Sequence, residues 1–274
     1  MRYVKDYRTI EIARQQKFVS CWYEKFVREL KPGRKRYKME IKILTWNINR
    51  AAYARKNLWK YLEKLNFDIG LFQEVYIIPH EIRKNYYIVR GEMNAILLKK
   101  DIFMNIFKEN ILQINSENDV IVDFCISCET MLFGNKLTLL SIYNYMGPDV
   151  SAFSKFLEIL YGYIRGNRNE IIIIGGDFNM DEKFQKQLKK WGLLAREMKR
   201  ELSRLGYIDV FYEKYGENAS TFLAHSNKKP YQLDYLFIPK DIKFVDVKVG
   251  DKNEIFNAKP RLSDHLPIVA TVKI

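Results

Sequence analysis

The sequence has 274 residues, of which 47% are hydrophobic and 14% aromatic, a composition that suits one large α/β domain with a well-filled core. We expect no membrane insertion, because no apolar run approaches a membrane span and the charged N-terminus lacks the apolar segment of a signal peptide. The three cysteines are an odd number in a long chain, which argues against a disulfide framework and favours a cytoplasmic location. The net charge of +13 favours an anionic partner.

Much of the positive charge lies before Met39. Residues 1–38 contain 12 Lys or Arg against 4 Asp or Glu. Apolar residues recur there at every fourth position from Phe18 to Leu30, a spacing that predicts an amphipathic helix, and the linker-like stretch KPGRKRYK follows. We therefore expect residues 1–38 to form a basic helical extension that packs on the main domain. The alternative is a segment that binds a membrane surface or the substrate.

Residues 39–274 form the main domain, in which the pattern changes to strands alternating with helices. Strand-length apolar runs predict strands at residues 39–47, 67–75, 94–100, 120–127, 136–145, 171–179, 207–211, 231–239, 242–249 and 265–274. Helical spacing predicts helices at residues 55–66, 149–165 and 182–205, the last of them interrupted at Gly192. Many strands with helices between them, together with runs of consecutive strands, predict a layered α/β sandwich.

One predicted strand ends in an unusual way. The stretch IIIIGGDFNM, residues 171–180, runs from four isoleucines through two glycines to Asp177 and Asn179. The isoleucines indicate a strand buried on both faces, where an unpaired carboxylate is costly. In extended chain Asp177 and Asn179 face the same side, which favours a shared site. The alternative is a turn in which the two side chains satisfy local backbone groups.

Other polar residues also fall at the ends of predicted strands, and Asp234 lies inside one, flanked by apolar residues. The full set is Asn47, Glu74, Tyr143, Asn144, Asp177, Asn179, Asp234, Asp264 and His265. Each residue alone could be a cap or a satisfied core group. Together they predict one site at one edge of a sheet, where ligand sites of α/β proteins lie.

The residue types in this set limit the chemistry. Four carboxylates and one histidine occur without a thiol, a Walker-type loop or an H-E-x-x-H motif, which argues against an ordinary catalytic zinc site. Oxygen ligands suit a hard cation such as Mg²⁺, which keeps waters and binds substrate phosphate oxygens. The remaining carboxylates can orient an attacking water and hold the histidine. The set therefore predicts metal-assisted hydrolysis of a phosphate ester.

Six short stretches occur in the order TWN, FQEV, SIYN, GGDFNM, QLDYLFIP and SDHLP. In this order they resemble the endonuclease/exonuclease/phosphatase superfamily, which includes deoxyribonuclease I, exonuclease III and its apurinic-site endonuclease relatives, sphingomyelinases and inositol polyphosphate phosphatases. The resemblance covers residues 39–274, and the exonuclease III branch is the nearest one. It implies an α/β four-layer sandwich of two packed β-sheets flanked by helices, as in deoxyribonuclease I.

The resemblance also implies a metal site. Glu74 would be the principal Mg²⁺ ligand, with Asp264 near the metal and Asn47 beside it, and Mn²⁺ would be able to substitute. Exonuclease III relatives usually carry an acid two residues after the first asparagine, whereas this chain has Asn49 there. We therefore expect Asn49 to contact substrate, and the departure puts a second metal ligand in doubt.

The remaining implied roles concern the phosphate and the water. Asp177 would align or deprotonate the attacking water, and Asn179 would bind the phosphate or the water. His265, oriented by Asp234, would stabilise developing negative charge on a phosphate oxygen, and Tyr143 matches a phosphate-contacting tyrosine. Two further residues, Asn144 and Tyr231, are candidates for substrate binding.

These inferences predict a monomeric, Mg²⁺-dependent phosphodiesterase. Its most favoured activity is that of a nuclease that hydrolyses DNA, as an endonuclease or an exonuclease with a place in DNA repair, since the basic charge suits a nucleic-acid partner. One alternative is a phosphoesterase of the same superfamily that acts on phospholipids or inositol phosphates. A second alternative is a catalytically inactive nucleic-acid-binding module on the same fold.

Overall fold

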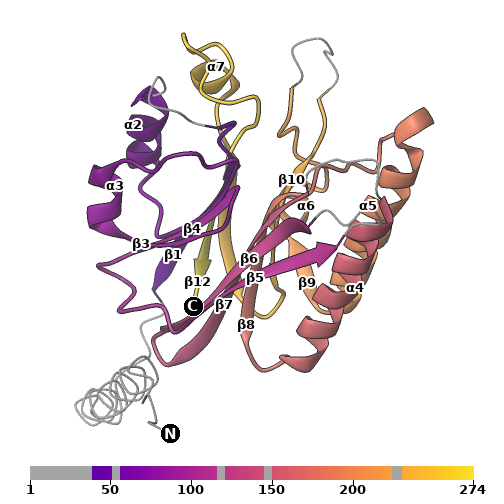
Figure 1. Cartoon of the computed structure of the whole chain (residues 1–274), viewed down its shortest axis with the longest axis horizontal. Helices are drawn as coiled ribbons and strands as arrows, with labels where there is room; N and C mark the ends of the chain where they lie inside the picture. The colour runs from indigo at the N-terminus through magenta and orange to yellow at the C-terminus, as the bar shows by residue number, and fades with distance from the viewer. Residues whose placement is uncertain (1–38, 51–55, 116–120, 145–149, 224–229) are drawn as a thin grey trace, which may run out of the picture. The chain divides into compact units, whose positions relative to one another are not determined.

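The computed structural model describes residues 39–50, 56–115, 121–144, 150–223 and 230–274. The basic helix and linker predicted within residues 1–38 lie outside the described residues. The described chain forms two six-stranded β-sheets that face each other, with helices on their outer faces (Figure 1).

Sheet A contains both ends of the described chain. Its strands, in order across the sheet, are β11 (Lys243–Val249), β12 (Ile268–Lys273), β1 (Glu40–Asn47), β2 (Ile69–Gln73), β4 (Asn94–Lys99) and β3 (Tyr86–Arg90). β1 and β2 are parallel, and the other neighbours are antiparallel.

Sheet B is formed mainly by the middle of the chain. Its strands, in order across the sheet, are β5 (Lys108–Asn115), β6 (Ile121–Leu132), β7 (Asn135–Tyr143), β8 (Ile171–Asp177), β10 (Asp234–Pro239) and β9 (Tyr207–Asp209). β7 and β8 are parallel, and the other neighbours are antiparallel.

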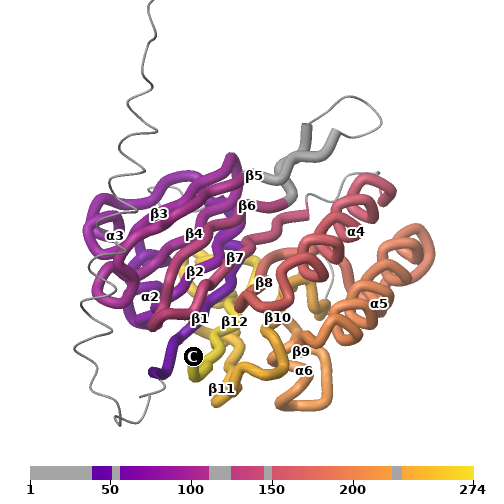
Figure 2. The backbone as a smooth tube through the Cα atoms, turned by 90° about the horizontal axis from the view of Figure 1, so that it is seen from below, coloured from indigo at the N-terminus to yellow at the C-terminus, as the bar shows by residue number. Residues whose placement is uncertain are grey.

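Four helices cover the outer faces of the two sheets. α2 (Lys56–Leu65) and α3 (His80–Asn85) cover sheet A, whereas α4 (Val150–Gly166) and α5 (Lys189–Arg204) cover sheet B (Figure 2). The other helices of the described ranges are η2 (Lys186–Leu188), α6 (Val210–Tyr215) and α7 (Lys252–Ile255). The layers follow the order helix, sheet, sheet, helix, which confirms the predicted four-layer α/β sandwich.

Side-chain alternation along each strand builds this layered core. In β8, Ile173 lies in the cluster between the two sheets, whereas Ile172 and Ile174 pack in the cluster beneath α4 and α5. This strand is buried on both faces, as its four isoleucines predict.

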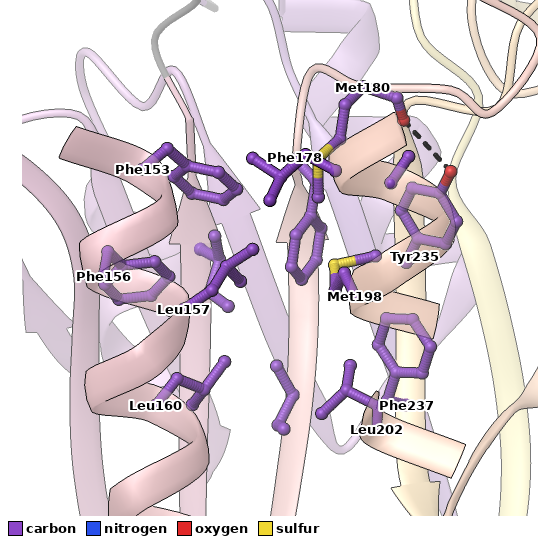
Figure 3. Packing of buried hydrophobic residues seen from close by; sticks show 14 of the residues in the cluster. Phe153, Phe156, Leu157, Leu160, Phe178, Met180, Met198, Leu202, Tyr235 and Phe237 are labelled. Carbon is purple, nitrogen blue, oxygen red and sulfur yellow. Dashed lines mark hydrogen bonds between the residues drawn. The ribbon is translucent and has the colours of Figure 1, made fainter. Parts of the chain in front are cut away.

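Aromatic packing anchors the chain where β8 ends. Phe178 makes edge-to-face contacts with Tyr235 and Phe153 at ring-centroid distances of 5.5 and 6.4 Å, and Tyr235 donates a hydrogen bond to the carbonyl of Met180 (Figure 3). These contacts hold Phe178 in the outer core, so its neighbour Asp177 is directed into the space between the sheets.

Several local predictions need correction. α5 runs through Gly192 without interruption, because a side chain there would meet the carbonyl oxygen of Phe184 at 2.8 Å and glycine allows this close packing. The edge strands β3 and β5 were not predicted, because their mixed apolar and polar residues lack a clear period. The strand predicted at residues 207–211 ends at Asp209, whose side chain accepts hydrogen bonds from the first amides of α6.

The two glycines before Asp177 should differ sharply in their tolerance of alanine. Gly176 has a φ of 154°, and an added Cβ would lie 1.9 Å from the carbonyl oxygen of Ile142, whereas a Cβ on Gly175 meets side-chain atoms at 2.7 Å or more. We expect Gly176→Ala to lower the free energy of unfolding by about 3 kcal/mol or more, and Gly175→Ala by about 1–2 kcal/mol. Urea denaturation measures both values, and equal losses would contradict the backbone explanation.

Candidate active site

Strand register brings three of the predicted site residues together where neighbouring strands of sheet B end or begin. Tyr143 of β7 pairs with Asp177 of β8, and Asp234 of β10 pairs with the same aspartate from the other side. All three are buried, and strand alternation directs them into the space between the sheets. Two buried carboxylates therefore lie on neighbouring strands, an arrangement that needs a compensating positive charge.

Sheet A contributes Asn47 and Glu74 at the same edge. Asn47 ends β1 and pairs with Gln73, so Glu74 follows directly beyond the pairing. The Nδ2 group of Asn47 donates to Glu74 Oε1 at 3.1 Å and to Asp177 Oδ2 at 2.9 Å. This one amide therefore joins carboxylates that belong to the two different sheets.

Glu74 lies at the outer side of this group. Its Oε1 also accepts a hydrogen bond from Tyr143 Oη at 3.0 Å, and its Oε2 lies 3.6 Å from Arg50 Nε. Its side chain is 19% exposed, whereas Asp177 and Asp234 are fully buried. Burial, followed by the charge of Glu74, raises the pKa of Tyr143 far above its usual value, so this phenol is a hydrogen-bond donor and no base.

His265 provides the charge between the two buried aspartates. Its Nδ1 donates to Asp234 Oδ2 at 2.8 Å, and its Nε2 lies 3.8 Å from Asp177 Oδ2. Burial alone would lower the pKa of His265, but the carboxylates of Asp234 and Asp177 outweigh it and raise the pKa to about 10. We therefore assign His265 as an imidazolium at neutral pH, with protons on both Nδ1 and Nε2.

The pKa of Asp177 is also raised, which for a carboxyl group favours the neutral form. Burial raises its pKa to about 7, although the charge of His265 and hydrogen bonds from Asn47 and Asn179 partly offset this effect. A carboxylate whose pKa lies near neutral pH is well matched to accept a proton from water. The pair therefore places a candidate proton acceptor beside a hydrogen-bond donor.

Backbone strain collects around the same carboxylates. Seven non-glycine residues in the described ranges have a positive φ, and four of them lie at this site, namely Asn49, Arg50, Glu74 and Asn179. Left-handed backbone costs a non-glycine residue about 1 kcal/mol or more, and it persists where surrounding contacts fix it. The clustering shows that contacts at the site hold the backbone of these four residues in a conformation that they would not adopt by themselves.

The turn after β8 contains both features that its sequence suggested, a shared site and a local turn. Asn179 donates from its backbone amide to Asp177 Oδ1 at 2.9 Å, which is the local turn, and from its Nδ2 to Asp177 Oδ2 at 3.1 Å. Because β8 ends at Asp177 and Asn179 has a φ of 49°, the two side chains meet through this turn and not through the strand pleat expected from the sequence. Asn144 is fully buried and donates to the carbonyl of Phe178, so it braces this turn from the end of β7.

The loop that carries Asp264 and His265 is fixed to β1. Ser263 Oγ donates to the carbonyl of Asn47 at 2.7 Å and accepts the amide of His265 at 3.0 Å, while Trp46 Nε1 donates to the carbonyl of His265 at 2.9 Å. This supporting role of Ser263 was not predicted from the sequence. Its position in the SDH motif was the available signal.

The start of β10 is fixed in a comparable way. Thr221 Oγ1 accepts hydrogen bonds from the backbone amides of Leu233 and Asp234 at 3.1 and 3.2 Å, a role that was not predicted from the sequence. Phe222 lies between the predicted residue Tyr231 and His265, since it forms β-bridges with both. The Phe222 ring contacts His265 at a centroid distance of 4.8 Å, whereas the Tyr231 ring packs against Phe184.

The donor set fits a hard cation at the outer side of the site. Asp177, Asp234 and His265 lie within 4.8 Å of one another, but their Asp234–His265 hydrogen bond, burial and imidazolium charge oppose a metal ion between them. Glu74 and Asp264 are partly exposed and offer carboxylate oxygens, the preferred ligands of Mg²⁺. Asn49 Nδ2 donates to Asp264 Oδ1 at 2.7 Å, and its backbone amide donates to Asn47 Oδ1, which links the two acids through the asparagines.

None of the helices in the described ranges has the length and hydrophobicity needed to span a membrane. Fold and site together define a four-layer α/β sandwich with an acidic, histidine-containing centre between its sheets. The protein belongs to the Endonuclease/Exonuclease/phosphatase family, which its sequence matches over residues 44–265. A search of curated proteins gave no match.

Solved structures share this fold. D. rerio TDP2 complexed with single strand DNA product is 16% identical with a TM-score of 0.63, over 86% of this chain and 99% of that chain. A variant of the 3′ phosphatase NExo from Neisseria, bound to product DNA hairpin, is 19% identical with a TM-score of 0.63, over 84% and 98%. An AP endonuclease from Archaeoglobus fulgidus is 19% identical with a TM-score of 0.62, over 85% and 100%.

The protonation of His265 can be measured directly. In the metal-free protein we expect its ring proton resonance in NMR spectra to titrate near pH 10 and not near 6.5, because two carboxylates face the ring. In Asp234→Asn the nearest charge is lost and burial acts with less opposition, so the pKa should fall below about 8. The chain has three histidines, and His265→Ala assigns the signal. Titration near pH 6.5 in the unsubstituted protein would contradict this electrostatic account.

Proposed function

We propose that the protein is a Mg²⁺-dependent phosphodiesterase that hydrolyses DNA. The observation that carries this proposal is the buried group Asp177–His265–Asp234 beside the partly exposed acid Glu74. One side of the site offers a base and a fixed positive charge, and the other offers metal ligands. Family membership supports phosphate-ester cleavage as the reaction class.

In this proposal each buried residue acts on a different part of the reaction. Asp177 aligns the attacking water and accepts its proton, while Asn179 holds Asp177 in position and contacts the phosphate or the water. His265 Nε2–H donates to a non-bridging phosphate oxygen and stabilises the charge that develops there. Asp234 fixes the ring orientation and keeps His265 protonated. Tyr143 positions Glu74 and adds a donor near the phosphate.

Glu74 and Asp264 would hold the metal ion. When bound, Mg²⁺, or Mn²⁺ in its place, supplies Lewis-acid stabilisation of phosphate charge. Asn47 acts mainly as the bridge between Glu74 and Asp177, because its oxygen already accepts the backbone amide of Asn49.

DNA is the proposed substrate. The net charge of +13 suits a polyanion, and two of the similar structures contain DNA products. Tyr76 is 56% exposed two residues after Glu74, and Phe222 contacts His265, so both are candidates for stacking on bases. Asn49 and Tyr231 remain candidates for substrate contact. We further propose that the enzyme acts as a cytoplasmic monomer.

Two alternatives differ in substrate or in activity. A phospholipid or inositol phosphate phosphoesterase would use the same residues, and the apolar stripe that favours it lies within residues 1–38, outside the described residues. A catalytically inactive DNA-binding module would not need the fully buried Asp177–His265–Asp234 group, whose charges are costly to maintain.

A cleavage assay on three end-labelled DNAs tests the proposal. The substrates are single-stranded DNA, intact duplex, and duplex with one abasic site, each with Mg²⁺ and with EDTA. We expect Mg²⁺-dependent cleavage, and the product pattern separates exonuclease, nicking and abasic-site activities. If the folded, metal-loaded protein cleaves none of them, DNA is the wrong substrate, and RNA, phospholipids and inositol phosphates are tested next.

Two buried aspartates provide a matched test of the catalytic assignment. Asp177→Asn should reduce cleavage by about 10³-fold, because the base is lost while the shape is kept. Asp181 is equally buried, but it accepts the backbone amides of Lys183 and Gln232 and so supports the fold. Asp181→Asn should lower the melting temperature and leave cleavage per folded molecule within about threefold. Similar rate losses in the two variants would remove the catalytic role from Asp177.

A further inference from the structure

Arg50 lies beside the acid to which we assign the metal. Its Nε lies 3.6 Å from Glu74 Oε2, and its side chain is 60% exposed while that of Glu74 is 19% exposed. The other carboxylate oxygen of Glu74 is bound by Asn47 and Tyr143. The guanidinium therefore faces the oxygen that these two residues leave available for a cation.

The backbone holds Arg50 in this position against its own preference. Asn49 and Arg50 have φ values of 46° and 50°, and arginine adopts this left-handed conformation rarely, whereas asparagine tolerates it. Asn49 is fixed on both sides, since its backbone amide donates to Asn47 Oδ1 and its Nδ2 donates to Asp264 Oδ1. The turn that presents Arg50 is thus built from the site residues themselves.

The ion pair with Glu74 is suited to exchange. Arg50 is largely exposed, and its 3.6 Å distance from Glu74 is beyond that of a good hydrogen bond, so the guanidinium can leave the carboxylate at low cost. A divalent cation that binds Glu74 would displace it by charge repulsion. A displaced guanidinium at the mouth of the site has a planar fork of donors that matches phosphate oxygens.

We propose that Arg50 is a phosphate-binding residue that shares the Glu74 carboxylate with the metal. Without metal, Arg50 neutralises Glu74 and keeps the outer acid paired. With metal bound, Arg50 turns to the DNA phosphate, so metal binding and substrate binding are coupled through one side chain. This inference rests on the proposed function, because it takes Glu74 as a metal ligand and DNA as the substrate.

Two binding measurements test the inference without turnover. Arg50→Ala removes a competing cation, so Mn²⁺ should bind the full-length protein about fivefold more tightly in titrations followed by electron paramagnetic resonance. In an Asp177→Asn background with Mg²⁺, the same substitution should weaken binding of a short DNA duplex about tenfold and reduce the slope of log K against log salt concentration by about 1. Arg50→Lys should return the Mn²⁺ affinity to that of the unsubstituted protein but should recover only part of the DNA affinity, since lysine lacks the planar fork of donors.

Arg204 provides the matched control. Its side chain is 63% exposed and pairs with Glu201 on α5, so Arg204→Ala removes an equally exposed arginine ion pair. We expect it to change neither affinity by more than about twofold. If Arg50→Ala binds Mn²⁺ no more tightly and DNA no more weakly than Arg204→Ala does, Arg50 is only a surface ion pair. Both effects in a protein that cleaves no DNA would support Arg50 while overturning the proposed function.

Discussion

The candidate site depends on one side-chain amide, that of Asn47. Its Nδ2 group donates to Glu74 from sheet A and to Asp177 from sheet B, so it fixes the acids of the two sheets relative to each other. The chain at Asn47 is itself held from the far end of the sequence, because Ser263 binds its carbonyl and Trp46 binds the carbonyl of His265. Residues more than 200 positions apart thus meet at one sheet edge. The geometry of the site therefore depends on the sandwich being complete.

The charges of the site lie at the ends of the strands, at positions that face the space between the two sheets. Strand alternation fills the space between the sheets with Ile, Leu and Val, and the same inward-facing positions become polar where the strands end. Two buried carboxylates on paired strands would repel each other and lose hydration, and a protonated histidine between them offsets both costs. The same low-dielectric setting makes the histidine a strong donor to a phosphate oxygen. Burial thus serves the chemistry as well as the fold.

Sequence periodicity predicted the layered fold and most of its strands, because buried strands such as β8 and amphipathic helices such as α4 have clear patterns. The position of acids at strand ends also predicted that Asp177, Asp234 and His265 meet, and the structure places them in contact distance. The strands β3 and β5 were not predicted, because their mixed apolar and polar residues lack a clear period. The interruption predicted at Gly192 was wrong, because the fit of this glycine against Phe184 is a tertiary contact. The role of Thr221 has no local signature, because its hydroxyl binds backbone amides 12 and 13 positions away, whereas the position of Ser263 in the SDHLP stretch was a usable signal. The positive φ at Arg50 could not be predicted either, because no sequence pattern indicates a left-handed backbone conformation at an arginine.

Cleavage of DNA in H₂¹⁸O, followed by mass spectrometry of the product phosphates, shows directly whether water attacks phosphorus. We expect one ¹⁸O atom in each phosphate end that is formed, because the water aligned by Asp177 attacks phosphorus. Asp177→Asn should remove the labelled product together with the activity. Cleavage products without ¹⁸O in the phosphate would show that the strand is broken by elimination or by attack at carbon. That result would contradict the role assigned to the Asp177–His265–Asp234 group.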